Sequence, residues 1–97
     1  MKAKRIFGEK YVFSHGSIVE MIIWRLPRHT RERPHEIKYR LYYGSADGRS
    51  KVRYDNELGK GDHRHYEDVE EPYEFKNVET LVGDFLRDVA KVRRTAL

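Results

Sequence analysis

The stretch I-K-Y-R-L-Y-Y at residues 37–43 shows the clearest two-residue alternation in the chain. Ile37, Tyr39, Leu41 and Tyr43 fall on one parity, and basic or aromatic residues fall between them. Because successive side chains of a strand point to opposite faces of a sheet, this alternation predicts a strand with one apolar face and one basic face.

The residues that follow predict an antiparallel hairpin. A-D-G at residues 46–48 supplies turn chemistry, and a second strand is expected from Arg49 to about Asp55. The pleat then places Val52 and Tyr54 on the apolar face. The opposite face is expected to carry four cations: Lys38, Arg40, Lys51 and Arg53. Like charges at this density are tolerable if the face is wet, is threaded with acidic residues or binds a polyanion.

Two further segments have strand character. Residues 18–26 are apolar on both parities, which predicts a strand in mid-sheet or one shielded on both sides, and Pro27 ends it. Trp24 in this segment is expected in the core rather than as a stacking platform. Residues 4–13, interrupted by Gly8, are compatible with a short strand, a short helix or an arm.

Residues 77–93 predict one long helix. Asn77 is a good N-cap, and the acidic start and basic end of the segment match the helix dipole. Apolar side chains recur at helical spacing: Val78, Leu81, Val82, Phe85, Leu86, Val89 and Val92. The expected fold is therefore α+β, a single two-layer domain over residues 1–97 in which an antiparallel sheet of three to five strands packs on the C-terminal helix.

Composition bounds the class of protein. The 97 residues suffice for one small core, and 12% aromatic residues argue against a disordered chain. The absence of Cys excludes disulfides and thiolate chemistry, and no apolar run has membrane-spanning length. We therefore expect a soluble, cytoplasmic protein with no membrane contact. The net charge of +4 raises the odds of an anionic partner such as nucleic acid.

The segment V-R-Y-D-N-E-L-G-K-G-D-H-R-H at residues 52–65 gathers the side chains that can do chemistry. It begins as a strand and is expected to continue, from near Asn56, as a polar loop punctuated by glycines. Its polar and charged residues lie close together in the sequence: Asp55, Asn56, Glu57, Lys60, Asp62, His63, Arg64 and His65. A loop needs only a few such residues to fold, so their density favours a functional role.

The motif Y-D-N-E at residues 54–57, followed by G-K-G-D-H-R-H at residues 59–65, resembles the TumE family of small toxins from bacterial toxin–antitoxin modules. The resemblance includes G-S-I at residues 16–18 and E-P-Y at residues 71–73, and it covers roughly residues 14–90. It implies a toxin encoded beside a helix-turn-helix antitoxin that would bind and silence it. It supplies no catalytic residues, so their roles must be argued from chemistry.

The first functional hypothesis is an RNA-cleaving toxin, a small endoribonuclease that needs no cofactor. RNA cleavage through the 2′-hydroxyl needs a base, an acid and cations against the charge that builds on phosphorus. His63 and His65 are the expected pair, because histidine titrates near neutral pH and residues i and i+2 of an extended segment share a side. Asp55 or Glu57 would orient an imidazole. The expected nucleic-acid-binding residues are the cations nearby: Lys60, Arg64, Arg53, Arg40, Lys38 and Lys51.

The second hypothesis is a divalent metal site. Five side chains offer the mixed nitrogen and oxygen ligands that suit Mn, Fe or Zn: Asp55, Glu57, Asp62, His63 and His65. A metal held there would activate water for hydrolysis of a phosphodiester.

The third hypothesis is a module that binds RNA, DNA or an acidic antitoxin through the basic face and does no chemistry. In a purely structural interpretation, the polar side chains cap turns and pair with one another within the loop.

Overall fold

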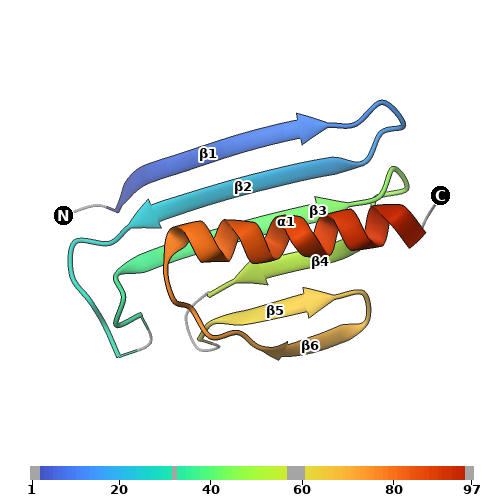
Figure 1. Cartoon of the computed structure of the whole chain (residues 1–97). Coiled ribbons are helices and arrows are strands. Elements are labelled where there is room, and N and C mark those ends of the chain that lie inside the picture. Colours follow the sequence, from blue (N-terminus) through green and yellow to red (C-terminus); the bar gives the residue numbers. More distant parts are fainter. Residues whose placement is uncertain (1–2, 32, 57–60, 96–97) are drawn as a thin grey trace.

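The computed structural model describes residues 3–31, 33–56 and 61–95 of the chain. Within these residues, six strands form one antiparallel sheet in the order of the sequence, and a helix follows them (Figure 1). The elements are β1 (Lys4–Val12), β2 (Ile18–Arg25), β3 (Ile37–Gly44), β4 (Ser50–Asp55), β5 (His63–Tyr66), β6 (Val69–Pro72) and α1 (Val78–Thr95). No helix in this part of the chain is both long and apolar enough to cross a bilayer.

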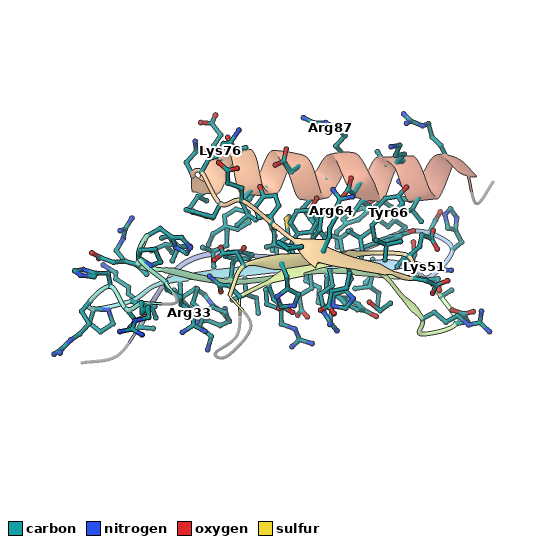
Figure 2. All side chains as sticks on the ribbon, turned by 90° about the horizontal axis from the view of Figure 1, so that it is seen from below. Arg33, Lys51, Arg64, Tyr66, Lys76 and Arg87 are labelled. Carbon is teal, nitrogen blue, oxygen red and sulfur yellow. The ribbon has the colours of Figure 1, made fainter. Side chains whose placement is uncertain are left out.

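The helix α1 lies over β3 and β4 on one face of the sheet and leaves the other face open (Figure 1, Figure 2). Leu81 and Phe85 of α1 are fully buried against the sheet. The predicted alternation in the central hairpin is confirmed, because its apolar residues are at most 5% exposed: Ile37, Tyr39, Leu41, Tyr43, Val52 and Tyr54. Each buried side chain of this size contributes roughly 1.5–3 kcal/mol. The predicted two-layer α+β fold with one C-terminal helix is therefore confirmed.

The helix begins where its sequence predicts. The backbone N–H of Thr80 donates to Asn77 Oδ1 at 2.7 Å, so Asn77 is the N-cap. Glu79 lies in the first turn, and Arg93 and Arg94 lie in the last, where they match the helix dipole.

The sheet has six strands, so the expected count of three to five is wrong. Strands β1 and β6 are the two edges, and every residue in both is exposed. An edge strand without a buried face has no apolar alternation, which hides it from pattern analysis. The polar loop expected from Asn56 onward is also corrected, because His63–Tyr66 form β5 with polar side chains on both faces.

Trp24 does not lie in the core, contrary to expectation. It pairs with Lys38 across β2 and β3, on the face that α1 leaves open. Its side chain is half-buried, and the Lys38 ammonium lies 5.1 Å from the ring centroid. One face of β2 contributes Val19, Met21 and Ile23 to the buried core, and the other keeps Ile22 and Trp24 half-buried.

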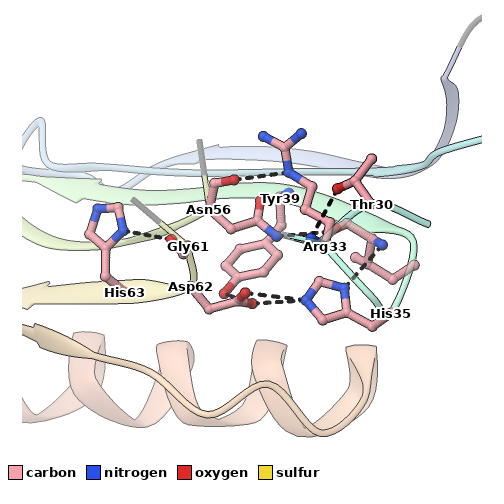
Figure 3. A network of polar contacts seen from close by, with 9 residues as sticks. Thr30, Arg33, His35, Tyr39, Asn56, Gly61, Asp62 and His63 are labelled. Carbon is pink, nitrogen blue, oxygen red and sulfur yellow. Dashed lines mark hydrogen bonds and ion pairs between the residues drawn. The ribbon is translucent and has the colours of Figure 1, made fainter. Parts of the chain in front are cut away.

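Asn56 fixes the end of β4 against β3. It is 1% exposed, its Oδ1 accepts from the Tyr39 backbone N–H at 3.1 Å, and its Nδ2 donates to the Ile37 carbonyl at 2.7 Å. The Asn56 carbonyl accepts from Arg33 Nε at 2.9 Å (Figure 3). These contacts hold the chain in place one residue after Asp55.

Tyrosine–aspartate hydrogen bonds tie the segments around the core to one another. The pairs, with oxygen–oxygen distances, are Tyr39–Asp62 at 2.7 Å, Tyr54–Asp88 at 2.5 Å and Tyr73–Asp84 at 2.7 Å. Burial, and then the hydrogen bond to Asp62, raises the pKa of Tyr39 far above its ordinary value. Asp62 also contacts His35, so Tyr39 links the core to the segment that precedes β5 (Figure 3).

We predict that Tyr39 makes the fold sensitive to high pH. Above about pH 10 the unfolded tyrosine loses its proton while the folded one keeps it, so the unfolding free energy falls by about 1.4 kcal/mol per pH unit. Tyr39→Phe should remove this contribution to the fall of the unfolding free energy with pH, measured by urea denaturation at several pH values between 9 and 11. The exposed Tyr11→Phe is the control, and an identical slope in both variants would contradict the prediction.

Candidate functional site

Strand register brings five polar side chains together on the open face. Asp55 pairs with His63 and Arg53 pairs with His65 across β4 and β5, and Glu70 of β6 pairs with His65. Because directly paired residues point to the same face of a sheet, all five side chains point away from α1. We call these residues the two-histidine cluster.

The side chains of the cluster form a closed ring of contacts. His63 Nε2 lies 2.8 Å from Asp55 Oδ1 and 3.6 Å from Glu70 Oε2. His65 Nε2 lies 2.8 Å from the same Glu70 oxygen and 2.9 Å from Arg53 Nη2. Arg53 Nε lies 3.1 Å from Asp55 Oδ2, which closes the ring. The predicted pair His63 and His65 therefore meets on one side of the sheet, with ring centroids 5.5 Å apart.

The contacts of His63 place its protons. Its Nδ1 lies 3.1 Å from the Gly61 carbonyl, which can only accept, so Nδ1 carries a proton (Figure 3). Its Nε2 faces Asp55 and Glu70, which are also acceptors when ionised. The arrangement is satisfied when a second proton, or another cation, lies at Nε2.

His65 has competing partners at a single nitrogen. When Nε2 carries the proton it donates to Glu70, and when it does not it accepts from Arg53. Both states therefore have a partner in place. A ring that can gain or lose a proton with little movement around it is suited to general acid–base chemistry.

The cluster borders an open pocket of about 400 Å³. Asp62, His63, Glu70, Glu71 and Pro72 line this pocket. The side chain of His65 is 27% exposed and that of His63 only 8%, so His65 is the more accessible of the two rings, while His63 lines the pocket.

The other predicted residues divide between the faces. Lys38 and Arg40 lie on the open face by register, and Arg40 pairs directly with Asp55 of the cluster. Lys51 lies at the register shift between β3 and β4 and has no partner residue in β3. Asp62 lies beside the cluster, but its carboxylate contacts His35 and Tyr39 instead. The remaining two, Glu57 and Lys60, lie outside the described residues.

Arg64 lies on the opposite face from the histidines. Figure 2 shows it in the layer between the sheet and α1, where its Nε lies 2.7 Å from Glu71 Oε1 and its Nη1 lies 3.2 Å from Asp88 Oδ2. Burial alone would lower the pKa of Arg64, but Asp88, Tyr54 and Glu71 together raise it. The structure therefore does not bring Arg64 together with the cluster. Arg64 instead connects β5 to α1.

Sequence reasoning missed Glu70 and His35. Glu70 joins the cluster because the turn at Glu67 and Asp68 folds β6 back onto β5, and Glu67 has a φ of 55°. That turn lies in an acidic run, which gave no apolar signal for a hairpin. His35 Nε2 lies 3.1 Å from Asp62 Oδ2, and its ring lies 4.0 Å from that of Phe75.

A family model described as Toxin TumE matches residues 3–93 of the chain. No curated protein and no solved structure matches it.

We predict that Asp55 stabilises the fold as well as the cluster. Asp55→Asn leaves His63 and Arg53 facing a neutral amide, and loss of one partner from a buried charged group should lower the unfolding free energy by roughly 2–4 kcal/mol. Urea denaturation at pH 7 measures the effect. Asp68→Asn, in the exposed turn after β5, should change stability by less than about 0.5 kcal/mol. Equal values for the two variants would reject the prediction.

Proposed function

The chain belongs to the TumE toxin family, and we propose that this toxin of a toxin–antitoxin system acts on RNA as a small endoribonuclease. The observation that carries the proposal is the meeting of two imidazole nitrogens, two carboxylates and a guanidinium beside an open pocket on one sheet face. Family membership alone does not fix a reaction, so the mechanism is argued from these side chains.

The two proton transfers of cleavage through the 2′-hydroxyl can be assigned to the two histidines. His65, whose Nε2 lone pair has Arg53 as an alternative partner, is the base that takes the 2′-hydroxyl proton. His63, with Asp55 and Gly61 as acceptors on its two nitrogens, is the acid that protonates the leaving 5′-oxygen. A pair of this kind contributes about 10²–10⁴ in rate for each transferred proton. The step needs no metal.

Basic residues of the open face supply the binding surface. Arg53 lies in the cluster and would stabilise the charge on phosphorus, while Arg40 and Lys38 extend the positive surface across β3. Lys51 of β4 and Lys60, which lies outside the described residues, are the other proposed contacts with RNA. Contacts between such residues and phosphates carry most of the affinity for RNA and little sequence preference.

The alternative function is an RNA- or partner-binding module without catalysis. The open face supports it, because Trp24 and Tyr42 lie there half-buried among basic residues and bases can stack on such rings. In that case the contacts of the two-histidine cluster serve only to pair β4, β5 and β6.

We predict that purified protein cleaves single-stranded RNA in the presence of EDTA. His63→Ala and His65→Ala should each lower the rate by about 10²–10⁴, because each removes one proton transfer. The measurement uses end-labelled RNA at neutral pH, and circular dichroism checks that each variant is folded. His29→Ala, which changes an exposed histidine far from the cluster in sequence, is the matched control and should cleave at the wild-type rate.

The same assay separates the two functions. Replacing the 2′-hydroxyl at the cleaved position with hydrogen should stop cleavage and leave binding intact. RNA that is retained but never cut supports the binding module. Full cleavage by the double histidine variant would reject the cluster as the catalytic site, and neither binding nor cleavage would reject an RNA function.

The antitoxin completes the system. Membership in a toxin family implies an antitoxin partner, and we propose that it is a helix-turn-helix protein encoded beside this chain. Co-expression with the product of the adjacent small reading frame should suppress growth arrest, and failure to copurify with it would contradict the proposal.

A further inference from the structure

We infer that the two-histidine cluster also binds a divalent transition-metal ion such as Zn²⁺, and that the bound ion switches the toxin off. The ligands are His63 Nε2, His65 Nε2 and a Glu70 carboxylate oxygen, which all lie within 4.8 Å of one another. The binding site stands on geometry alone, whereas the inhibitory role rests on the proposed RNA cleavage.

The separations of the Glu70 oxygen from the two histidine nitrogens are close to those around a tetrahedral ion, and the histidine nitrogens lie within 4.8 Å of each other. Zinc bonds of about 2.1 Å place two ligand atoms roughly 3.4 Å apart. The Glu70 oxygen lies 2.8 Å from His65 Nε2 and 3.6 Å from His63 Nε2, which bracket that value. Small side-chain shifts would therefore complete the coordination, and Glu70 has room to move because its side chain is 49% exposed.

The surroundings of His63 orient it as a metal ligand. Its Nδ1 faces the Gly61 carbonyl (Figure 3), which leaves Nε2 as the nitrogen that can bind an ion, and Nε2 faces Asp55 and Glu70. Metal-binding histidines commonly donate their other ring N–H to a backbone carbonyl in this way. Asp55 Oδ1, 2.8 Å from Nε2, adds a further oxygen at the same point, and a mixed set of nitrogen and oxygen donors suits Zn, Mn or Fe.

Arg53 opposes the ion. Its Nη2 lies 2.9 Å from His65 Nε2, where it takes up the lone pair that the ion would need. The Arg53 side chain is 32% exposed and can turn outward. Removing its charge should tighten metal binding, although the same residue supports the binding of phosphate.

Metal binding and the proposed catalysis compete for the same nitrogen atoms. An ion at Nε2 of His65 removes the lone pair of the base, and an ion at Nε2 of His63 removes the proton of the acid. A loaded cluster would therefore be unable to cleave RNA by the proposed route. A site of this design makes toxicity fall as free metal rises.

The metal site is tested without RNA, by isothermal titration of Zn²⁺ into the metal-free full-length protein. We expect one ion per chain, with Glu70→Gln and His65→Ala each weakening binding at least tenfold. Glu67→Gln, an exposed carboxylate in the adjacent turn, is the matched control and should bind as wild type. Arg53→Gln should bind more tightly. Equal affinity of wild type and Glu70→Gln, or no binding, would overturn the site and leave the proposed RNA cleavage untouched.

The inhibitory role is tested in the cleavage assay. One equivalent of Zn²⁺ should abolish cleavage by the wild type, and EDTA should restore it. Cleavage that is lost in EDTA and restored by Zn²⁺ or Mn²⁺ would overturn both the inhibitory role and the metal-free mechanism. If the protein cleaves no RNA, the proposed function and the inhibitory role fail together, while the titration still decides whether the metal site exists.

Discussion

The pleat of the central β3–β4 hairpin is the constraint on which the rest of the molecule depends. It sends Tyr39, Leu41, Val52 and Tyr54 under α1, and it sends Arg53 to the open face. A slip of one residue in register would exchange the two faces, exposing the core and burying the charges. The same alternation of side chains therefore specifies both the core and the proposed functional face. Burial of the apolar side chains beneath α1 fixes which side chains the open face presents.

Sequence pattern was sufficient wherever burial was one-sided. It predicts the helix and the two faces of the hairpin, because each rests on a period that one buried face enforces. The shared side of His63 and His65 followed from their i, i+2 spacing in an extended segment. Sequence pattern fails for β5 and β6, two short strands without an apolar alternation, and so it does not predict that Glu70 pairs with His65. The sequence analysis also grouped Arg64 with the histidines because it lies between them in the chain. Successive side chains of β5 point to opposite faces, however, so Arg64 points toward α1.

The two-histidine cluster combines a buried carboxylate, which holds the rings in place, with an exposed carboxylate, which an incoming ligand could displace or recruit. Asp55 is buried and fixed between His63 and Arg53, whereas Glu70 reaches in from an exposed edge strand. An entering phosphate is an anion and would displace Glu70, while an entering metal ion would recruit it and displace Arg53. In this proposal the more exposed members, Glu70 and Arg53, decide which ligand the histidines bind, and the buried Asp55 keeps His63 oriented.

The most direct test of this account is to map where RNA touches the protein. Backbone and histidine side-chain NMR shifts should be recorded while a single-stranded oligonucleotide lacking 2′-hydroxyls, which cannot be cut, is added. The account predicts that the largest changes occur at His63, His65 and Arg53 and extend across the open face toward Lys38, with α1 unchanged. Changes confined to α1 or to β1 would contradict it.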